Sequence, residues 1–389
     1  MAKRVLGIAV VGIGGAVGTT MAAGVELLKK GLIDTTGLPL ADLSVKGIAD
    51  YTDIIFAGWD LFGDNLAAAA ESHEVLTYKQ HIAVQDELRK IKPLAAHGNE
   101  KFLSNIDGEN KISENGHRAT IAKIKANIAE FKGQCDSVVV INLASTEKLA
   151  VEGNEIFNSI KAFEQALDND SPYISPAMLY AYAAIAEGVP YGNFTPSLSA
   201  DIRALIQFAE SAKVPVAGKD GKTGQTFIKS VIAPALRSRS LHVEGWFSTN
   251  ILGNRDGLAL SNADSLASKV KTKSSLLDDI LGYDVPDHIV DIRYYRPRGD
   301  NKEAWDNIDV RGFLGQPMQL KINFLCKDSI LAAPLAIEIA RCLDLAQQRG
   351  EFGIQEQLSV FFKKPMTKAD ATEQAFHKQE ERLLAWLGN

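Results

Sequence analysis

Cysteine is scarce in this sequence: Cys135, Cys326 and Cys342 are the only three among 389 residues. They are odd in number and scattered through apolar sequence, and none belongs to a CxxC pair or lies near a histidine at metal-ligand spacing. This pattern argues against a disulfide framework and against structural zinc. We therefore expect no metal held by a cysteine and histidine cluster.

Long apolar runs and an excess of positive charge are also lacking. No run approaches the roughly 18 residues of a membrane helix, and residues 1–4 lead directly into an apolar segment without the pattern of a signal peptide. The net charge of −6 gives no electrostatic footprint for nucleic acid. We expect a cytoplasmic protein without membrane or nucleic-acid partners, in which a local group of lysines meets any anionic ligand.

Apolar residues are abundant, at 46% of the chain, which is enough for the cores of two domains. In the first 220 residues, short apolar runs alternate with helical patterns, and this alternation predicts a parallel sheet. The expected strands are residues 5–11, 53–57, 137–142 and 214–217, and the expected helices are residues 19–30, 121–132 and 175–187.

The pattern changes after about residue 241. Segments 242–249, 288–295 and 318–324 alternate or are rich in strand-forming residues, which indicates an open sheet, and segment 329–348 is again apolar and helical. We therefore predict an α/β protein in which a doubly wound Rossmann-type domain, residues 1–226 and 328–389, is interrupted by a smaller α+β domain, residues 227–327.

A glycine-rich loop lies between the first expected strand and helix, where a phosphate-binding turn belongs. Its spacing is one residue longer than G-x-G-x-x-G, so a turn without a ligand is the alternative. For the ribose carboxylate we prefer Asp60, which follows the second strand, over Asp34, which has no strand before it. The loop residues are Gly12, Gly14, Gly15, Ala16, Val17 and Gly18.

Several polar segments, most of them rich in lysine, recur further along the chain. Residues 218–226 follow an apolar strand, at the end where α/β proteins build their sites, and Lys269 and Lys273 stand four residues apart. Each segment by itself is equally typical of a turn or a solvated face. The others are residues 253–257, 299–302, 326–329 and 362–365.

The order of these segments and the residues in them resemble the successive sequence motifs of myo-inositol-1-phosphate synthases. The matching segments run from the glycine loop to about Pro365 and are GKDGKTGQT, GNRDGLALS, SKVKTKS, GDNK, KDSILAAP, FAGWD and EGVPY. A collinear match of many motifs is far more specific than any one of them. The resemblance implies a Rossmann-type fold, NAD as cofactor, a sugar phosphate as substrate and a homotetramer.

The resemblance also implies roles for single residues. The glycine loop would hold the NAD pyrophosphate, Asp60 the adenosine ribose, and the stretch from Asn142 to Thr146 the cofactor cleft, with Ala144 and Ser145 inside it. Asp220, Asn254 and Asp256 would lie near the nicotinamide. The lysines of the family's active site fall on Lys269, Lys273, Lys302 and Lys363, with Asp328 as a partner carboxylate.

The implied chemistry explains why such a site needs several lysines. NAD oxidises C5 of glucose 6-phosphate, C6 is deprotonated and joins C1 in an aldol step, and the hydride returns to C5. Ammonium groups can bind the phosphate and stabilise the enolate, and crowding lowers the pKa of one lysine so that it can act as a base. We expect Lys269 and Lys273 to handle protons at O5, Lys302 to act at the C1 oxygen, and Lys363 at the phosphate or enolate.

The chain also departs from the family pattern. Arg255 stands where many members carry asparagine, and Lys219 replaces a residue of a more acidic stretch. The alternatives are an ordinary NAD(P)-dependent dehydrogenase of similar build and a catalytically silent NAD-binding protein. The sequence leaves open whether a divalent cation or ammonium is required.

Overall fold

The chain packs into two compact units in the computed structural model, and each contains two separate stretches of sequence. The structure describes residues 4–103, 106–148, 154–253, 276–369 and 372–388. The first unit comprises residues 1–221 and 332–370, and the second comprises residues 222–331 and 371–389. Among the described residues, no helix is long and apolar enough to cross a membrane.

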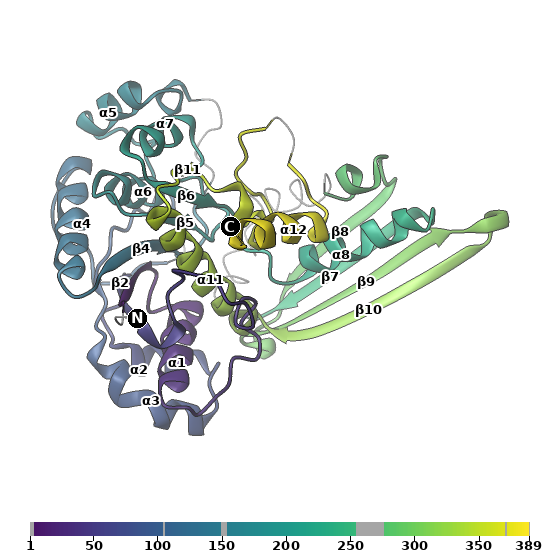
Figure 1. The fold of residues 1–389 in the computed structure, drawn as a ribbon, viewed down its shortest axis with the longest axis horizontal. Helices are drawn as coiled ribbons and strands as arrows, with labels where there is room; N and C mark the ends of the chain where they lie inside the picture. Colours follow the sequence, from purple (N-terminus) through teal and green to yellow (C-terminus); the bar gives the residue numbers. More distant parts are fainter. Residues whose placement is uncertain (1–3, 104–105, 149–153, 254–275, 370–371, 389) are drawn as a thin grey trace. The chain divides into compact units, whose positions relative to one another are not determined.

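A seven-stranded parallel sheet forms the centre of the first unit (Figure 1). Its order is β11-β6-β5-β4-β1-β2-β3, so the first strand lies inside the sheet and the chain winds outward on both sides of it. This is the doubly wound arrangement predicted from the sequence. The strands are β1 (Leu6–Val11), β2 (Ile54–Asp60), β3 (Leu94–Ala95), β4 (Ser137–Asn142), β5 (Tyr191–Asn193), β6 (Pro215–Gly218) and β11 (Gly353–Ile354).

Helices cover both faces of this sheet, which explains why every residue of β1 is buried. On one face, Ala9 and Val140 pack with α4 and the apolar helix α6. On the other, Ile339 and Leu343 of α11 approach β5 at Gly192. The helices that lie wholly in this unit are α1 (Ala16–Lys29), α2 (Leu66–His73), α3 (Tyr78–Lys90), α4 (His117–Lys132), α5 (Ile160–Asp168), α6 (Pro176–Ala186) and α7 (Arg203–Ala212), while α11 (Asp328–Gln348) begins in the second unit.

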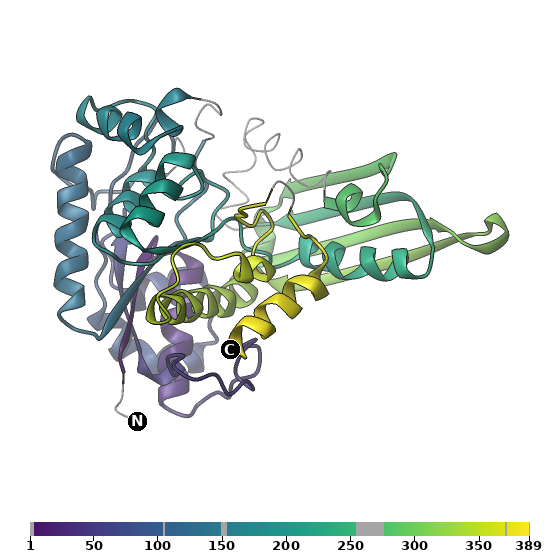
Figure 2. The same cartoon turned by 45° about the horizontal axis from the view of Figure 1, so that its top comes forward.

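The second unit is built on a four-stranded mixed sheet in the order β10-β9-β7-β8 (Figure 2). Trp246 and Ile308 pack with Leu236 in its apolar core, which the helical residues 276–281 help to cover. The elements are α8 (Gln225–Ser238), β7 (His242–Leu252), β8 (Asp287–Tyr294), β9 (Asn301–Arg311), β10 (Pro317–Lys327) and α12 (Phe376–Leu387). Short 3₁₀ turns complete the fold at Tyr51–Asp53, Glu155–Phe157, Arg296–Arg298, Phe313–Gly315 and Glu356–Phe361.

The C-terminal helix α12 belongs to the second unit, whereas the sequence-based division placed all of residues 328–389 with the first. The cause is packing against α8: the rings of Phe376 and Phe227 meet edge to face at 5.2 Å, and the Lys222 ammonium donates a hydrogen bond to Gln379. Residues 222–226, expected in the first unit, also lie in the second.

Candidate active site

The carboxyl ends of five strands in the first unit meet along one edge of the sheet. Strand pairing aligns Trp59, Val11, Asn142, Asn193 and Gly218 in a single row across β2, β1, β4, β5 and β6. Each strand ends at this row or, in β2, one residue beyond it, so the loops that follow all start at the same edge. In open α/β sheets, ligands bind in the crevice at this edge.

The glycine loop turns sharply at the end of β1. Gly12 has a φ of +85°, and a Cβ there would lie 3.0 Å from the Cα of Ala144. At Gly18 a Cβ would lie 2.5 Å from the carbonyl oxygen of Ile13, so this glycine allows α1 to pack against the loop. The extra residue in the spacing is thus accommodated, and the loop leads into the amino end of α1, where anions are favoured.

Replacing Gly12 by alanine is expected to weaken NAD binding at least tenfold and to lower the free energy of unfolding by about 1–3 kcal/mol, because the side chain needs a strained positive φ and meets backbone. Gly24→Ala is the matched control. It lies within α1, nothing lies within 4 Å of its Cβ position, and it should be neutral or stabilising.

These two variants are compared by titrating NAD against protein fluorescence and by urea unfolding. Equal NAD affinity in Gly12→Ala and the wild type would contradict the assignment of this loop to the cofactor.

Asp60, the last residue of β2, lies beside the glycine loop, as the sequence predicted. Its Oδ2 accepts a hydrogen bond of 2.9 Å from the Gly14 amide, and its Oδ1 accepts one of 3.0 Å from the amide of Phe62. Asp34, the alternative, is exposed in the segment between α1 and β2. The role of Asp60 toward a ribose stays a prediction, but its place next to the loop suits that role.

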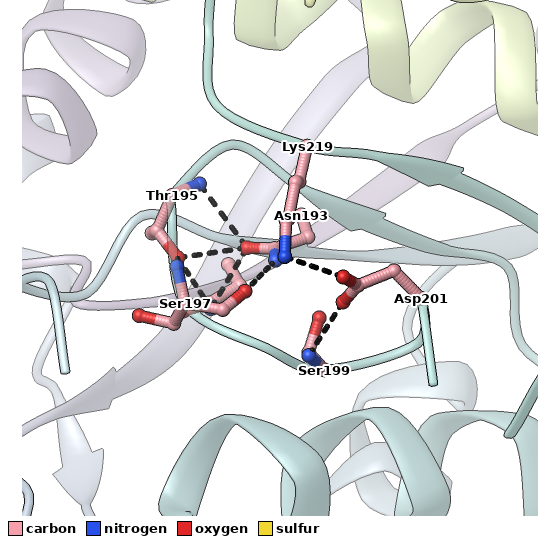
Figure 3. Close-up of polar contacts among 7 residues, drawn as sticks. Asn193, Thr195, Ser197, Ser199, Asp201 and Lys219 are labelled. Atoms are coloured by element: carbon pink, nitrogen blue, oxygen red, sulfur yellow. Dashed lines mark hydrogen bonds and ion pairs between the residues drawn. The ribbon is translucent and has the colours of Figure 1, made fainter. Parts of the chain in front are cut away.

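A buried hydrogen-bond network connects the loops after β4 and β5 (Figure 3). The Asn142 amide nitrogen donates to Asn193 Oδ1 at 3.2 Å, and the same oxygen accepts from the Thr195 hydroxyl at 2.9 Å. The Asn193 amide nitrogen donates to the Ser197 carbonyl at 2.8 Å. The network thus joins the start of the stretch from Asn142 to Thr146, predicted to line the cofactor cleft, to the end of β5 and the loop after it.

Two lysine–carboxylate pairs flank the end of β6. Lys363 Nζ lies 2.7 Å from Asp220 Oδ1, and the Lys363 amide donates to the Asp220 carbonyl at 2.6 Å. Lys219 Nζ lies 2.5 Å from Asp201 Oδ2. The structure therefore brings together Asp220 and Lys363, which the family resemblance named separately and which lie 143 residues apart in the sequence.

In the second unit, Lys302 and Asp328 lie close together; the resemblance named Asp328 as a partner carboxylate of the lysines without saying which one. Lys302 Nζ is 3.3 Å from Asp328 Oδ1, which also accepts a hydrogen bond of 3.3 Å from the Thr223 hydroxyl. The same ammonium lies 3.4 Å from the Cβ position of Gly224, the residue that precedes α8. The Lys302 ammonium thus lies beside the positive end of a 14-residue helix, with the Asp328 carboxylate offsetting part of the charge.

Sequence reasoning missed two buried lysines of the second unit. Desolvation lowers the pKa of Lys222 and of Lys229 to about 7 in each case, and Lys229 Nζ lies 2.6 Å from His288 Nε2. Lys222 stands inside the GKDGKTGQT motif and could have been noticed there, whereas Lys229 stands in an ordinary helical pattern that gives no signal.

Some of the predicted site residues lie outside the described part of the chain. These are Asn254, Asp256, Lys269 and Lys273, together with Arg255. Within the residues that the structure describes, no three His, Cys, Asp or Glu side chains gather in a way that could hold a metal ion.

A doubly wound parallel sheet with a glycine turn after β1 and a carboxylate at the end of β2 defines a Rossmann-type dinucleotide-binding protein. Residues 38–388 match the model of an NAD-binding family described as myo-inositol-1-phosphate synthase, and the chain belongs to this family.

Individual relatives agree with this assignment. Inositol-3-phosphate synthase 1 of Bacteroides thetaiotaomicron is 43% identical over 384 residues, covering 93% of this chain and 89% of that protein. Inositol-3-phosphate synthase 1 of Oryza sativa is 30% identical, covering 88% and 74%. Among solved structures, inositol-3-phosphate synthase of Caenorhabditis elegans superposes with a TM-score of 0.90 at 26% identity, covering 99% of this chain and 85% of that one. A myo-inositol-1-phosphate synthase-related protein of Thermotoga maritima has a TM-score of 0.83 at 25% identity, covering 99% of both chains.

Proposed function

We propose that this protein is an NAD-dependent inositol-3-phosphate synthase, an isomerase that converts D-glucose 6-phosphate into 1D-myo-inositol 3-phosphate, also called L-myo-inositol 1-phosphate. The observation that carries the proposal is the Lys363–Asp220 pair at the carboxyl edge of a dinucleotide-binding sheet, in a member of the synthase family. A silent NAD-binding protein has no need for a lysine fixed there, and an ordinary dehydrogenase is distinguished by net production of NADH.

The cofactor site fits NAD on the geometry of the glycine loop. A Cβ at Gly12 would lie 3.0 Å from Ala144 Cα and one at Gly14 would lie 3.0 Å from Asp60 Oδ2, so glycine at both positions allows the tight turn. This turn leads to the amino end of α1, where a pyrophosphate would bind. Asp60 would bind the adenosine ribose, and the loop from Asn142 to Thr146 would line the cleft. NAD supplies the reversible removal of a hydride from C5.

The lysines act on charge that develops in the sugar phosphate. Oxidation at C5 makes the C6 protons acidic, loss of one gives an enolate, and its C6 attacks the C1 aldehyde to close the ring. Lys363, oriented by Asp220, would stabilise the enolate or bind the phosphate. Lys302, held by Asp328, would donate to the C1 oxygen as it becomes an alkoxide. Lys269 and Lys273 are proposed to move the protons at O5.

The reaction is tested by phosphorus NMR of the protein with glucose 6-phosphate and catalytic NAD, while absorbance of NADH is followed. Formation of inositol phosphate without steady accumulation of NADH is the expected result, because the hydride returns to the ring. Net NADH would identify a dehydrogenase instead. Bound NAD without any reaction would favour a silent binder. Repeating the assay after chelation and with added ammonium or divalent cations settles the cation requirement.

We also infer that the protein is a cytoplasmic homotetramer, as the family resemblance implies. One face of the four-stranded sheet supports an interface: the ring centroids of Phe247 and Trp305 lie 5.5 Å apart with the rings tilted by 35°, and the two residues line a surface hollow of about 550 Å³ together with Asn307, Lys321 and Asn323. Trp305 remains 37% exposed, which is unusual for so large an apolar side chain. Light scattering of the purified protein tests the state, and a monomer would contradict it.

A further inference from the structure

Glu147 is a buried carboxylate that the proposed reaction does not use. It follows Thr146 directly, in the loop after β4 that is predicted to line the cofactor cleft, and is only 7% exposed. Its Oε1 accepts a hydrogen bond of 2.8 Å from the amide of Ala177, the second residue of α6. Its own amide donates to the Ser197 hydroxyl at 3.0 Å, so Glu147 joins the β4 loop to both the β5 loop and α6.

The carboxylate lies at the positive end of a helix but in a desolvated environment. Burial raises the pKa of Glu147 to about 7, against the opposing effects of the Ser175 hydroxyl and the Ala177 amide. A buried group with this pKa changes its charge within the physiological range.

The buried phenols and the partly buried imidazole around it do not change charge in the same range. Burial raises the pKa of Tyr180 on α6 and of Tyr191 on β5 far above neutrality, so both phenols stay neutral. His97, whose amide donates to Tyr180, has a pKa lowered to about 4 by burial and also stays neutral. The ammonium of Lys219 offsets the charge of Asp201 near Tyr191, and Lys148 is exposed.

The order of the strands places this charge relative to the cofactor. β4 and β5 lie on one side of β1 and β2 lies on the other. A dinucleotide whose pyrophosphate lies on the glycine loop and whose adenosine ribose meets Asp60 must extend its nicotinamide half toward β4 and β5. The nicotinamide ring is cationic in NAD⁺ and neutral in NADH, so a negative charge at this end favours the oxidised form.

We propose that Glu147 is a positioning residue that selects NAD⁺ over NADH, through its buried carboxylate beneath the β4 and β5 loops. The inference rests on the cofactor assigned in the proposed function and not on the cyclisation. From a mixture of the two forms the enzyme would therefore take up NAD⁺, which is the form that the first step requires. The preference increases as the pH rises through about 7 and is lost as the carboxylate gains a proton.

The test measures the dissociation constants of NAD⁺ and NADH by calorimetry at pH 6.0 and 8.5, without sugar phosphate. For the wild type, we expect the ratio of the NADH constant to the NAD⁺ constant to be about 3- to 10-fold higher at pH 8.5 than at pH 6.0. Glu147→Gln should hold the ratio at its low-pH value throughout. Glu147→Asp, which keeps the charge, should restore the pH dependence, and Glu130→Gln, at an exposed position on α4, should behave as the wild type.

A structural anchor alone would weaken both cofactor forms equally and leave the ratio unchanged, which would overturn the proposal. If Glu147→Gln does not fold, a constant ratio in the wild type from pH 6.0 to 8.5 overturns it just as well. Failure of the wild type to bind either cofactor would refute the NAD assignment and this inference together. Binding with the expected ratio but no inositol phosphate would leave the inference standing and refute only the synthase.

Discussion

Lys363→Met is expected to lower kcat for inositol phosphate formation by about 10²- to 10³-fold while changing NAD affinity by less than threefold. Removal of one preorganised charge from a developing oxyanion typically has an effect of this size. Methionine keeps most of the aliphatic volume of lysine, so the decrease in kcat measures the effect of removing the ammonium group. The Lys363 amide, which donates to the Asp220 carbonyl, is retained in the variant. Activity is followed by phosphorus NMR and NAD affinity by calorimetry.

The adjacent Lys364 provides a matched control, because its side chain is exposed. Lys364→Met should keep wild-type turnover. Asp220→Asn should lose nearly as much activity as Lys363→Met, and the double variant should lose little more than either single one, because the two residues act as a unit. If the losses of activation free energy in the two single variants add up in the double variant, Lys363 and Asp220 do not act as a pair.

Lys302→Met is expected to reduce kcat/KM for glucose 6-phosphate by about 10²- to 10³-fold, because the ammonium at the amino end of α8 is removed. Asp328→Asn should have a smaller effect of about tenfold, since it leaves the ammonium in place but withdraws one of its partners. Steady-state kinetics with varied sugar phosphate measures both. Tight binding of NAD should be retained in both variants, because the glycine loop and Asp60 are unchanged.

Lys378→Met is the control for this pair, because Lys378 is an exposed residue of α12 in the second unit with the same charge. It should retain full kcat/KM. A loss in Lys378→Met equal to that in Lys302→Met would show that the general charge of the second unit matters and not the ammonium beside α8.

The sequence predicted those strands whose pattern of apolar residues matches their burial in the folded protein. β1 and β4 are continuous apolar runs because helices cover both of their faces, and they were found within one residue of their ends. β9 was missed because Asp306 points into the core of the second unit, where it accepts hydrogen bonds from Trp246 at 2.7 Å and Ser248 at 2.6 Å. A buried aspartate among apolar residues breaks the alternation that identifies a strand.

The cofactor-binding residues and the lysines of the candidate site were predicted by different kinds of evidence. The glycine loop and Asp60 follow from the strand–turn–helix pattern alone, whereas the lysines required the family resemblance. Neither approach found Asn193, Ser197 or Glu147. Their function depends on β4 and β5 lying side by side, and β5 is a three-residue strand that is too short to leave a periodic signal.

The order of strands in the first unit has a consequence for synthesis on the ribosome. β6 pairs on one side with β5 and on the other with β11, which follows it by more than a hundred residues. Until residue 354 has emerged, the nascent chain carries β6 as an uncovered sheet edge and lacks α11 over β5. An open parallel edge invites pairing with other chains. Expression yield should therefore depend on how fast the ribosome crosses the inserted second unit, and truncation before β11 should give aggregates.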